Sequence, residues 1–378
     1  MSNIKIETLT PVHIGSGNLL YENLDFIQVN IKKVPHLVII SEEKVWKILD
    51  EQHLDNWLEA ISKRENFSLF LEKFAPNVKS SDYAKRRIPF SCKPSNYADV
   101  LKECIHNSIG LPYIPGSSIK GAIRTAILAS LTNTIKGKEE KIDLRKYKDD
   151  SPTNRNITAD NIERELFANN APQKSYPNAD VFRFIQVGDA YFEKETEIVV
   201  RLINLNFRHG KDNLLDTSNS QIVEAIRTEK KSEFQLKVSK EYYDFVKKKY
   251  PQTGNLPVSS IGDLFRLINE HTKKLVEDEV NYWINTDKTG GDNYVCEMQK
   301  ILKEINSCVT GKSCVLRIGH ASGWRFITGA WTETLQNFKE IIVPASRPNN
   351  RNYEDYDFPK TRRLGEDSYI LGFVKLSI

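Results

Sequence analysis

The sequence predicts an α+β protein of two domains, each built on a sheet that carries helical insertions. Alternating apolar and polar residues, which are typical of half-buried strands, recur near the N-terminus, after residue 181 and at the C-terminus. Apolar residues at helical spacing occupy the segments between them. At 378 residues the chain exceeds the usual size of one domain. We therefore expect domains at residues 1–180 and 181–378, the second with a glycine-rich loop near its C-terminal end.

The composition excludes several classes of protein. With 39% hydrophobic and 28% charged residues, global disorder is not expected. No apolar run approaches the roughly 20 residues that span a bilayer, and the first residues lack a signal-peptide pattern, so we expect a cytoplasmic protein without a membrane partner. The five cysteines are widely spaced, and the phosphate-loop and dinucleotide motifs are incomplete, so neither a metal nor a cofactor is expected. The net charge of +4 permits nucleic-acid binding without requiring it.

The N-terminal half predicts strands first and helices after them. A first strand ends at Pro11, and a loop with two glycines follows at residues 12–18. Prolines interrupt residues 67–108, which we expect to be an irregular insertion, and the polar stretch 136–178 predicts a mobile loop. The ordered elements expected before residue 67 are a strand at 4–9, a hairpin at 27–31 and 37–40, and a helical face from 45 to 61.

The segment LPYIPGSSIKGAIRTAIL, residues 111–128, places a short strand, a turn and an amphipathic helix end to end. Ser117 or Ser118 would cap this helix. Lys120 and Arg124 are four residues apart and would share one exposed face near the positive end of the helix dipole. An anionic backbone would fit there, and an ordinary capped helix with two solvated cations explains the pattern equally well.

The C-terminal half predicts a second sheet followed by a helical block. Its strands are expected from residue 181, and a short strand leads into a second glycine loop that begins at Gly319. The expected elements are strands at 181–192 and 197–205, helices at 224–246, 261–283 and 294–305, and strands at 314–318 and 369–376.

Two histidines lie at glycine loops, His13 beside Gly15-Ser16-Gly17 and His320 before Gly323. Glycine lets backbone N–H groups approach a phosphate closely, and it also simply permits tight turns. A metal-independent ribonuclease would need a general acid or base in such a place, but a loop histidine more often hydrogen-bonds the backbone or stacks on a base. The sequence alone offers no catalytic constellation, and no catalytic residue is assigned.

Basic and aromatic residues alternate near the C-terminus. Trp324 beside Arg325 would stack on unpaired bases while the guanidinium meets phosphate, although core packing is the usual fate of such aromatics. The same choice applies to the basic run near residue 360. The residues that we expect to contact RNA are His13, Gly15, Ser16, Gly17, Ser117, Ser118, Lys120, Arg124, Arg317, His320, Gly323, Trp324, Arg325, Lys360, Arg362 and Arg363.

Four segments together resemble the RAMP (repeat-associated mysterious protein) superfamily of CRISPR systems, and within it the family of fifth Csm subunits of type III-A effector complexes. They are LTPVHIGSGN at 9–18, LPYIPGSSIKGAIRTAIL at 111–128, RIGHASGWRFITG at 317–329 and PKTRRLGEDSYILGFVKL at 359–376. The resemblance implies two ferredoxin-like, RRM-related domains with helical insertions, and a C-terminal glycine loop that lies where RNA passes.

The resemblance also implies a function. Such subunits cap the 3′ region of the crRNA, contact the backbone subunit and the neighbouring small subunit, and help to mature the crRNA 3′ end by recruiting host nucleases. Target RNA is a further expected partner. The main hypothesis is therefore a non-catalytic crRNA-binding subunit. One alternative is a metal-independent RAMP endoribonuclease with His13 or His320 as general acid or base, and another is a structural cap that touches RNA little.

Overall fold

The computed structural model describes residues 1–49, 53–91, 100–135, 137, 140–141, 143–144, 157–158, 160–172, 176–206, 212–284, 289–336, 338, 359, 361–367 and 369–378. Helices and strands are mixed throughout these residues, which confirms the α+β prediction. Among them, no helix combines the length and the apolar character needed to cross a membrane.

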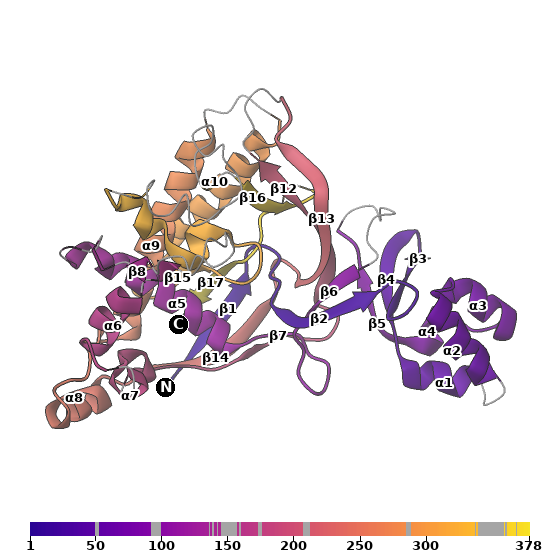
Figure 1. Ribbon diagram of the computed structural model, residues 1–378, viewed down its shortest axis with the longest axis horizontal. Helices are drawn as coiled ribbons and strands as arrows, with labels where there is room; N and C mark the ends of the chain where they lie inside the picture. The colour runs from indigo at the N-terminus through magenta and orange to yellow at the C-terminus, as the bar shows by residue number, and fades with distance from the viewer. Residues whose placement is uncertain are drawn as a thin grey trace.

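Segments from the two ends of the chain meet in one antiparallel sheet, called here the terminal sheet (Figure 1). Its strands are, in spatial order, β10 (Ile185–Val187), β14 (Lys231–Val238), β1 (Ser2–Thr8), β17 (Phe373–Ser377) and β15 (Ser313–Arg317). The register pairs Lys5 of β1 with Ser377 of β17. The first and last strands are therefore direct neighbours at the centre of the sheet.

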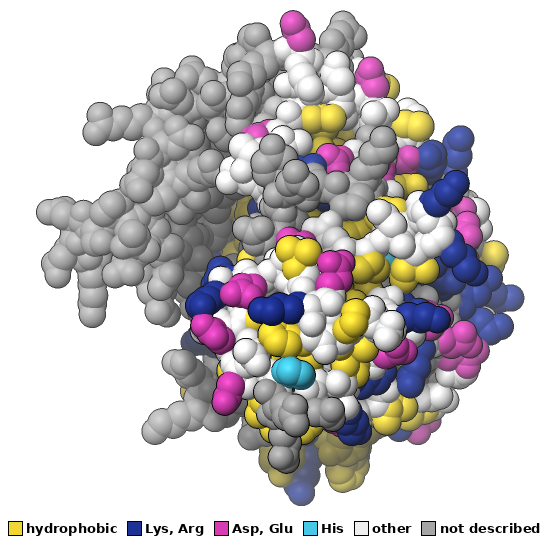
Figure 2. Space-filling model, turned by 90° about the vertical axis from the view of Figure 1, so that its right-hand side faces the viewer, with side chains coloured by type: hydrophobic (Ala, Val, Ile, Leu, Met, Phe, Trp, Pro, Cys, Tyr) yellow, Lys and Arg dark blue, Asp and Glu magenta, His cyan; other side chains and the backbone are white. Residues whose placement is uncertain are grey.

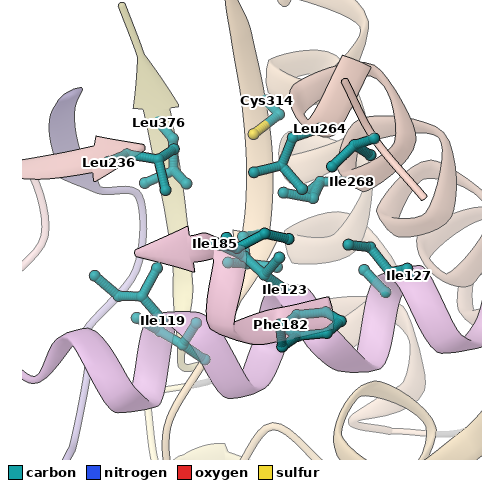
Figure 3. Close-up of a cluster of buried hydrophobic side chains, with 14 of the residues drawn as sticks. Ile119, Ile123, Ile127, Phe182, Ile185, Leu236, Leu264, Ile268, Cys314 and Leu376 are labelled. Carbon is teal, nitrogen blue, oxygen red and sulfur yellow. The ribbon is translucent and has the colours of Figure 1, made fainter. Parts of the chain in front are cut away.

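The alternation along β1 decides which face of the terminal sheet is buried. Ile4 and Ile6 are fully buried, whereas Lys5 between them is exposed. Two helices, α5 (Gly116–Leu131) and α9 (Ile261–Trp283), cover the apolar face. Figure 3 shows their side chains meeting those of the sheet. The labelled members of this core are Ile119, Ile123, Ile127, Phe182, Ile185, Leu236, Leu264, Ile268, Cys314 and Leu376.

A second sheet lies beside the terminal sheet and combines strands from both halves of the chain. In spatial order its strands are β16 (Thr361–Gly365), β12 (Glu197–Asn206), β13 (Leu215–Ile226), β6 (Val100–Cys104) and β2 (Gly15–Tyr21). The pair β13 and β6 is parallel, and the other three pairs are antiparallel. Each large sheet thus takes strands from both sides of the boundary expected at residues 180/181, which does not separate the two sheets.

A helical unit extends from the second sheet and builds its own core (Figure 1). Its strands β3 (Phe26–Ile31), β4 (Val34–Ile40) and β5 (Ala84–Pro89) form the insertion sheet, and its helices are α1 (Glu42–Leu49), α2 (Leu54–Lys63), α3 (Phe67–Phe74) and α4 (Ser80–Tyr83). The space-filling view from this side shows acidic, cationic and apolar side chains interspersed (Figure 2). Residues 67–108 are not irregular as predicted, because they contain α3, α4, β5 and β6.

Several other expectations are tested by the remaining elements. The strands at 197–205, 314–318 and 369–376 and the helices at 261–283 and 294–305 are confirmed within a few residues, the last as α10 (Gly291–Ser307). The helix expected at 224–246 is wrong, because that stretch contains the end of β13 in the second sheet and β14 in the terminal sheet, and only α8 (Lys240–Lys249) is helical. Much of the loop expected at 136–178 lies outside the described residues. The described part of that stretch contains β8 (Asp143–Leu144), β9 (Ile157–Thr158), α6 (Asp160–Ala168) and α7 (Tyr176–Ala179). The short strands β7 (Tyr113–Ile114) and β11 (Ala190–Tyr191) come before and after it in the chain.

Two glycines of α5, one closely packed and one open to solvent, allow a paired test of how the helix packs. A Cβ on Gly116 would lie 2.3 Å from the carbonyl oxygen of Val187, whereas a Cβ on Gly121 would meet nothing within 4 Å. We expect Gly116→Ala to lower the free energy of unfolding by about 1–3 kcal/mol through overpacking. Gly121→Ala should instead raise it by about 0.5–1 kcal/mol, because alanine favours a helix over glycine. Urea unfolding of both variants checks this, and equal effects would contradict the close approach.

Candidate nucleic-acid interface

The two glycine loops leave the terminal sheet at the same edge. β1 and β15 are each antiparallel to β17, so they run parallel to each other and the loops that follow them lie side by side. The backbone N–H of His320 donates a hydrogen bond to the carbonyl oxygen of His13 at 2.9 Å. Gly319 has φ +80°, and a Cβ there would lie 2.5 Å from that carbonyl oxygen. Glycine at this position therefore permits the contact between the loops.

This contact brings the two histidine rings together, with their centroids 5.6 Å apart and edge to face. His13 is 2% exposed, and its Nδ1–H donates to the carbonyl oxygen of Glu224 at 2.5 Å. Burial is the main cause that lowers the pKa of His13 to about 4, with smaller effects from His320 and Lys102. Burial also lowers the pKa of His320, followed by the charges of Lys102 and Arg363. Burial thus favours the uncharged form of both rings.

Lys102 on β6 and Arg363 on β16 supply the positive charge beside these rings. The Nη1 atom of Arg363 and the Nε2 atom of His320 are both buried, and neither has a hydrogen-bond partner among the described residues. The rest of the part-exposed Arg363 side chain and Lys102 give this end of the two loops positive charge, which suits an anionic ligand.

The glycines of the loops leave their backbone accessible. Gly17 has φ +92° and Gly323 has φ +81°, and a Cβ on either would meet nothing within 4 Å. The Oγ of Ser16 donates to Glu103 Oε2 at 3.2 Å, which fixes the first loop against β6. The structure thus brings His13 and His320 together, whereas Gly15, Ser16 and Gly17 form the start of β2 and not part of a loop as predicted, because this segment pairs with β6. Gly323 lies three residues after His320 in the second loop.

The start of α5 differs from the prediction. The N-cap is Pro115 without a side-chain hydrogen bond, so neither Ser117 nor Ser118 caps the helix and both lie in its first turn. The backbone N–H of Gly116 donates to Asp189 Oδ1 at 2.7 Å. A carboxylate of the protein therefore already occupies one of the positions that a phosphate would take at this helix end.

Arg124 is held by protein partners instead of facing solvent beside Lys120. Its guanidinium pairs with Glu163 and Asp180, each at 2.9 Å, and lies over the rings of Phe167 and Phe182. Lys120 is partly buried, and burial lowers its pKa. The physical reason is that α6 and the segment before β10 bring acids to this face, which the spacing within α5 does not reveal.

Three of the predicted arginines are held by partners within the fold. Arg325 and Arg362 both pair with the buried carboxylate of Glu279 in α9, at distances of 2.6 Å. Arg317 is 4% exposed, donates to the carbonyl oxygens of Leu371 and Ala321, and lies over aromatic rings. We therefore leave these three arginines out of the RNA interface that we propose below.

Of the remaining predicted residues, one packs against the core and one lies outside the described residues. Trp324 packs against Phe338, with ring centroids 6.1 Å apart, and against the core under α5. Lys360 lies outside the described residues. Lys102 was missed by the sequence analysis because it is a single cation in the alternating strand β6, and only the pairing of β6 with β2 and β13 brings it to the loops.

Comparison with known proteins follows this geometry. The sequence model of the RAMP superfamily matches residues 5–326. The chain belongs to the RAMP superfamily. This confirms the resemblance drawn from the four segments, and the mixed sheets and helices described above are a RAMP fold.

Three known proteins are similar to this RAMP protein in sequence or in structure. It is 32% identical over 196 residues to the CRISPR system protein Csm5 of Methanocaldococcus jannaschii, a match that covers 50% of this chain and 42% of that protein. A chain in the cryo-EM structure of a type III-A Csm–crRNA–target RNA ternary complex is similar over its whole length, with TM-score 0.71 and 19% identity. The crystal structure of T. onnurineus Csm5 matches 98% of this chain and 99% of that one, with TM-score 0.60 and 19% identity.

The buried carboxylate of Glu279 should control stability. Burial alone raises the pKa of Glu279, but the charges of Arg362 and Arg325 and their hydrogen bonds more than offset this and lower it to about 2. Glu279→Gln leaves the buried guanidinium of Arg362 without a counter-charge and leaves Arg325 with Glu333 alone, so we expect the free energy of unfolding to fall by about 3–5 kcal/mol. The control is Glu277→Gln in the same helix, whose exposed ion pair with Lys273 should contribute less than about 1 kcal/mol.

The pH dependence gives a second measurement of this carboxylate. Because the folded pKa lies below that of the unfolded chain, the unfolded state binds more protons, and the stability due to Glu279 is lost as pH falls from 4.5 to about 2. Chemical unfolding over this range should show a smaller loss in Glu279→Gln than in the wild type. An equal loss would contradict the assignment.

Proposed function

We propose that this RAMP protein is a non-catalytic RNA-binding subunit of a type III-A Csm complex that holds the 3′ region of the crRNA. The observation that carries the proposal is the meeting of the two glycine loops beside Lys102, His320 and Arg363. Similarity to two proteins named Csm5 and to a chain of a Csm–crRNA–target RNA complex supports the choice of complex.

The chemistry of this interface suits a phosphodiester backbone. Two cations stand beside His320, and the glycines of the same two segments leave backbone N–H groups open, so a phosphate oxygen would find both positive charge and N–H donors. The uncharged ring of His320 offers a nitrogen that exchanges a hydrogen bond with a ribose 2′-hydroxyl, and this group distinguishes RNA from DNA. Contacts of this kind tolerate many bases, so we expect little sequence preference.

The remaining partners belong to the same proposal. As a subunit of the complex, the chain contacts the backbone subunit and the small subunit, and it lies close enough to target RNA to touch it. By holding the 3′ region of the crRNA, the chain would position that end for host nucleases and so contribute to crRNA 3′-end maturation.

Lys102→Gln combined with Arg363→Gln should weaken binding of labelled single-stranded RNA. Each lost phosphate contact lowers the slope of log affinity against log salt by about 0.7, so the pair should lower it by about 1.4. The control is Lys5→Gln with Lys237→Gln, which removes the same charge from exposed positions of the terminal sheet. A wild-type affinity that does not depend on salt would contradict the phosphate interface.

Reconstitution of the Csm complex tests the position on the crRNA. With the wild-type chain, nuclease protection of the crRNA should extend further toward the 3′ end than in a complex that lacks the chain. The Lys102→Gln, Arg363→Gln chain should assemble yet lose this added protection. Protection that does not depend on the chain would instead indicate a structural cap.

The histidine pair favours one other function, metal-independent cleavage of CRISPR RNA. The structure places two rings 5.6 Å apart that the sequence separates by three hundred residues, and paired histidines are able to act as acid and base. A general acid must hold its proton near neutral pH, however, and burial together with Lys102 lowers the pKa of both rings. The geometry therefore suits RNA binding better than cleavage.

Incubation of RNA with the protein in EDTA distinguishes the two functions. We expect the wild type and His320→Ala to leave the RNA intact, with weaker binding by the variant. His36→Ala on β4 serves as a control for the loss of a histidine elsewhere. Cleavage that survives EDTA and His36→Ala but is abolished by His320→Ala would make the protein a ribonuclease.

A further inference from the structure

A cleft of about 430 Å³ lies between β5 and the segment that follows β6. Its volume falls within the range of about 300–1,000 Å³ that is typical of small-ligand sites. Neither glycine loop lines it. It is lined by β5, by Glu103 of β6 and residues 106–110, and by the turn before β12 together with Glu197 at the start of that strand.

The mouth of this cleft carries three exposed cations. Lys85 and Arg87 come from β5, and Lys194 comes from the turn before β12. Within the part of the chain that the structure describes, none of the three forms an ion pair. The exposed Glu195 also lines the cleft beside Lys194, so the three cations exceed the one acid there and an anion at the mouth would be attracted.

The floor of the cleft is polar and held rigidly. Arg86 pairs with Glu103 and with the fully buried Glu224, each at 3.2 Å, and His106 Nε2 lies 2.9 Å from Glu197 Oε1. Glu103, His106 and Glu224 are close enough together to suit a metal ion, but the guanidinium of Arg86 already supplies the positive charge among them. The floor offers carboxylate oxygens that accept hydrogen bonds, and Ile88 and Ile109 add an apolar wall.

The floor is connected directly to the first glycine loop. Glu103 Oε2 accepts hydrogen bonds from Ser16 Oγ at 3.2 Å and from Asn18 Nδ2 at 3.0 Å, while Glu103 Oε1 pairs with Arg86. A single carboxylate thus joins the loop to the cleft. A chain of nucleotides bound at the loop has the cleft as its immediate neighbour.

We propose that this cleft binds one ribonucleotide unit of single-stranded RNA, with its phosphate at Lys85, Arg87 and Lys194 and its base inside. The apolar wall would contact the face of the base, and the carboxylates of the floor would accept hydrogen bonds from its amino groups or from the ribose hydroxyl. An acidic peptide fits less well, because its carboxylates would face Glu103 and Glu197. This inference rests on the proposed function and extends the interface beyond the glycine loops.

The test compares two pairs of substitutions in the full chain. Lys85→Gln with Arg87→Gln removes two cations from the mouth, and Lys32→Gln with Lys33→Gln removes two exposed cations from the turn between β3 and β4 of the same sheet. With a labelled single-stranded RNA, the first pair should lower the salt slope by about 1.4 and the second should leave it unchanged. All four positions are exposed or on a surface turn, so thermal melting should be the same for both variants.

A crosslinking experiment tests whether a nucleotide of the RNA lies in the cleft. RNA that carries 4-thiouridine should crosslink to residues 106–110 or to β5 in the wild type, and less in Lys85→Gln, Arg87→Gln. Uridine 5′-monophosphate in excess shows whether a free nucleotide occupies the cleft, because it should reduce that crosslink without displacing the RNA from the loops.

The outcomes separate the cleft from the proposed function. If the cleft variant binds RNA like the wild type while Lys102→Gln, Arg363→Gln does not, the RNA interface stands and the cleft inference is wrong. If the wild type binds no RNA, both are wrong. If a labelled acidic peptide binds at the cleft and RNA does not crosslink there, the cleft is a protein-docking site and the inference is overturned.

Discussion

The position of β17 between β1 and β15 is the constraint on which the rest of the structure depends. Because β17 is antiparallel to both neighbours, β1 and β15 end at the same edge of the terminal sheet. The two loops that follow are about two strand spacings apart, roughly 9.5 Å, which is close enough for their backbones to meet. The hydrogen bond from His320 to His13 and the glycine at position 319 follow from this arrangement. Every element of the proposed RNA interface is placed relative to these two loops.

Charge in this protein is divided between cations that hold the fold together and cations that remain for a ligand. Arg317 and Arg362 are buried and Arg325 is part-buried, and Glu279 pairs with the last two. Arg86 performs the same task where the insertion sheet joins β6 and β13. Lys102 and Arg363 differ from these, because neither forms an ion pair among the described residues. A net charge of +4 therefore says little about where RNA binds.

The sequence predicts the fold class and many elements, and the reason is local periodicity. The strand at Ile4 and Ile6 and the long helix α9 both follow from apolar spacing, and both are confirmed. The strands β13 and β14 were missed, although Phe234 and Leu236 alternate with polar residues, because the apolar residues that precede them also fit a helical period. The interleaving of the sheets was not predictable, since it depends on pairs such as Lys5 with Ser377.

The candidate interface was predictable only where glycine marks it. His13, His320 and their glycines are visible in the sequence because glycine-rich loops are local features. Whether an arginine is free depends on partners that come from distant elements, such as Glu279 for Arg362 and Asp180 for Arg124. Lys102 illustrates the opposite case, because it has no local motif and the sheet alone brings it to the loops.

The central place of β17 also governs how this protein acquires its structure. Register pairs Lys5 with Ser377 and Thr8 with Val374, so β1 gains one of its two neighbours only after residue 377 has been synthesised. Until then one edge of β1 is unpaired, and an unpaired strand edge promotes aggregation. Contacts of such long sequence separation also slow folding, because the entropy of closing the loop is lost before they form. The terminal sheet is therefore completed only once residues 373–377 are available, and the contact between the two loops forms with it.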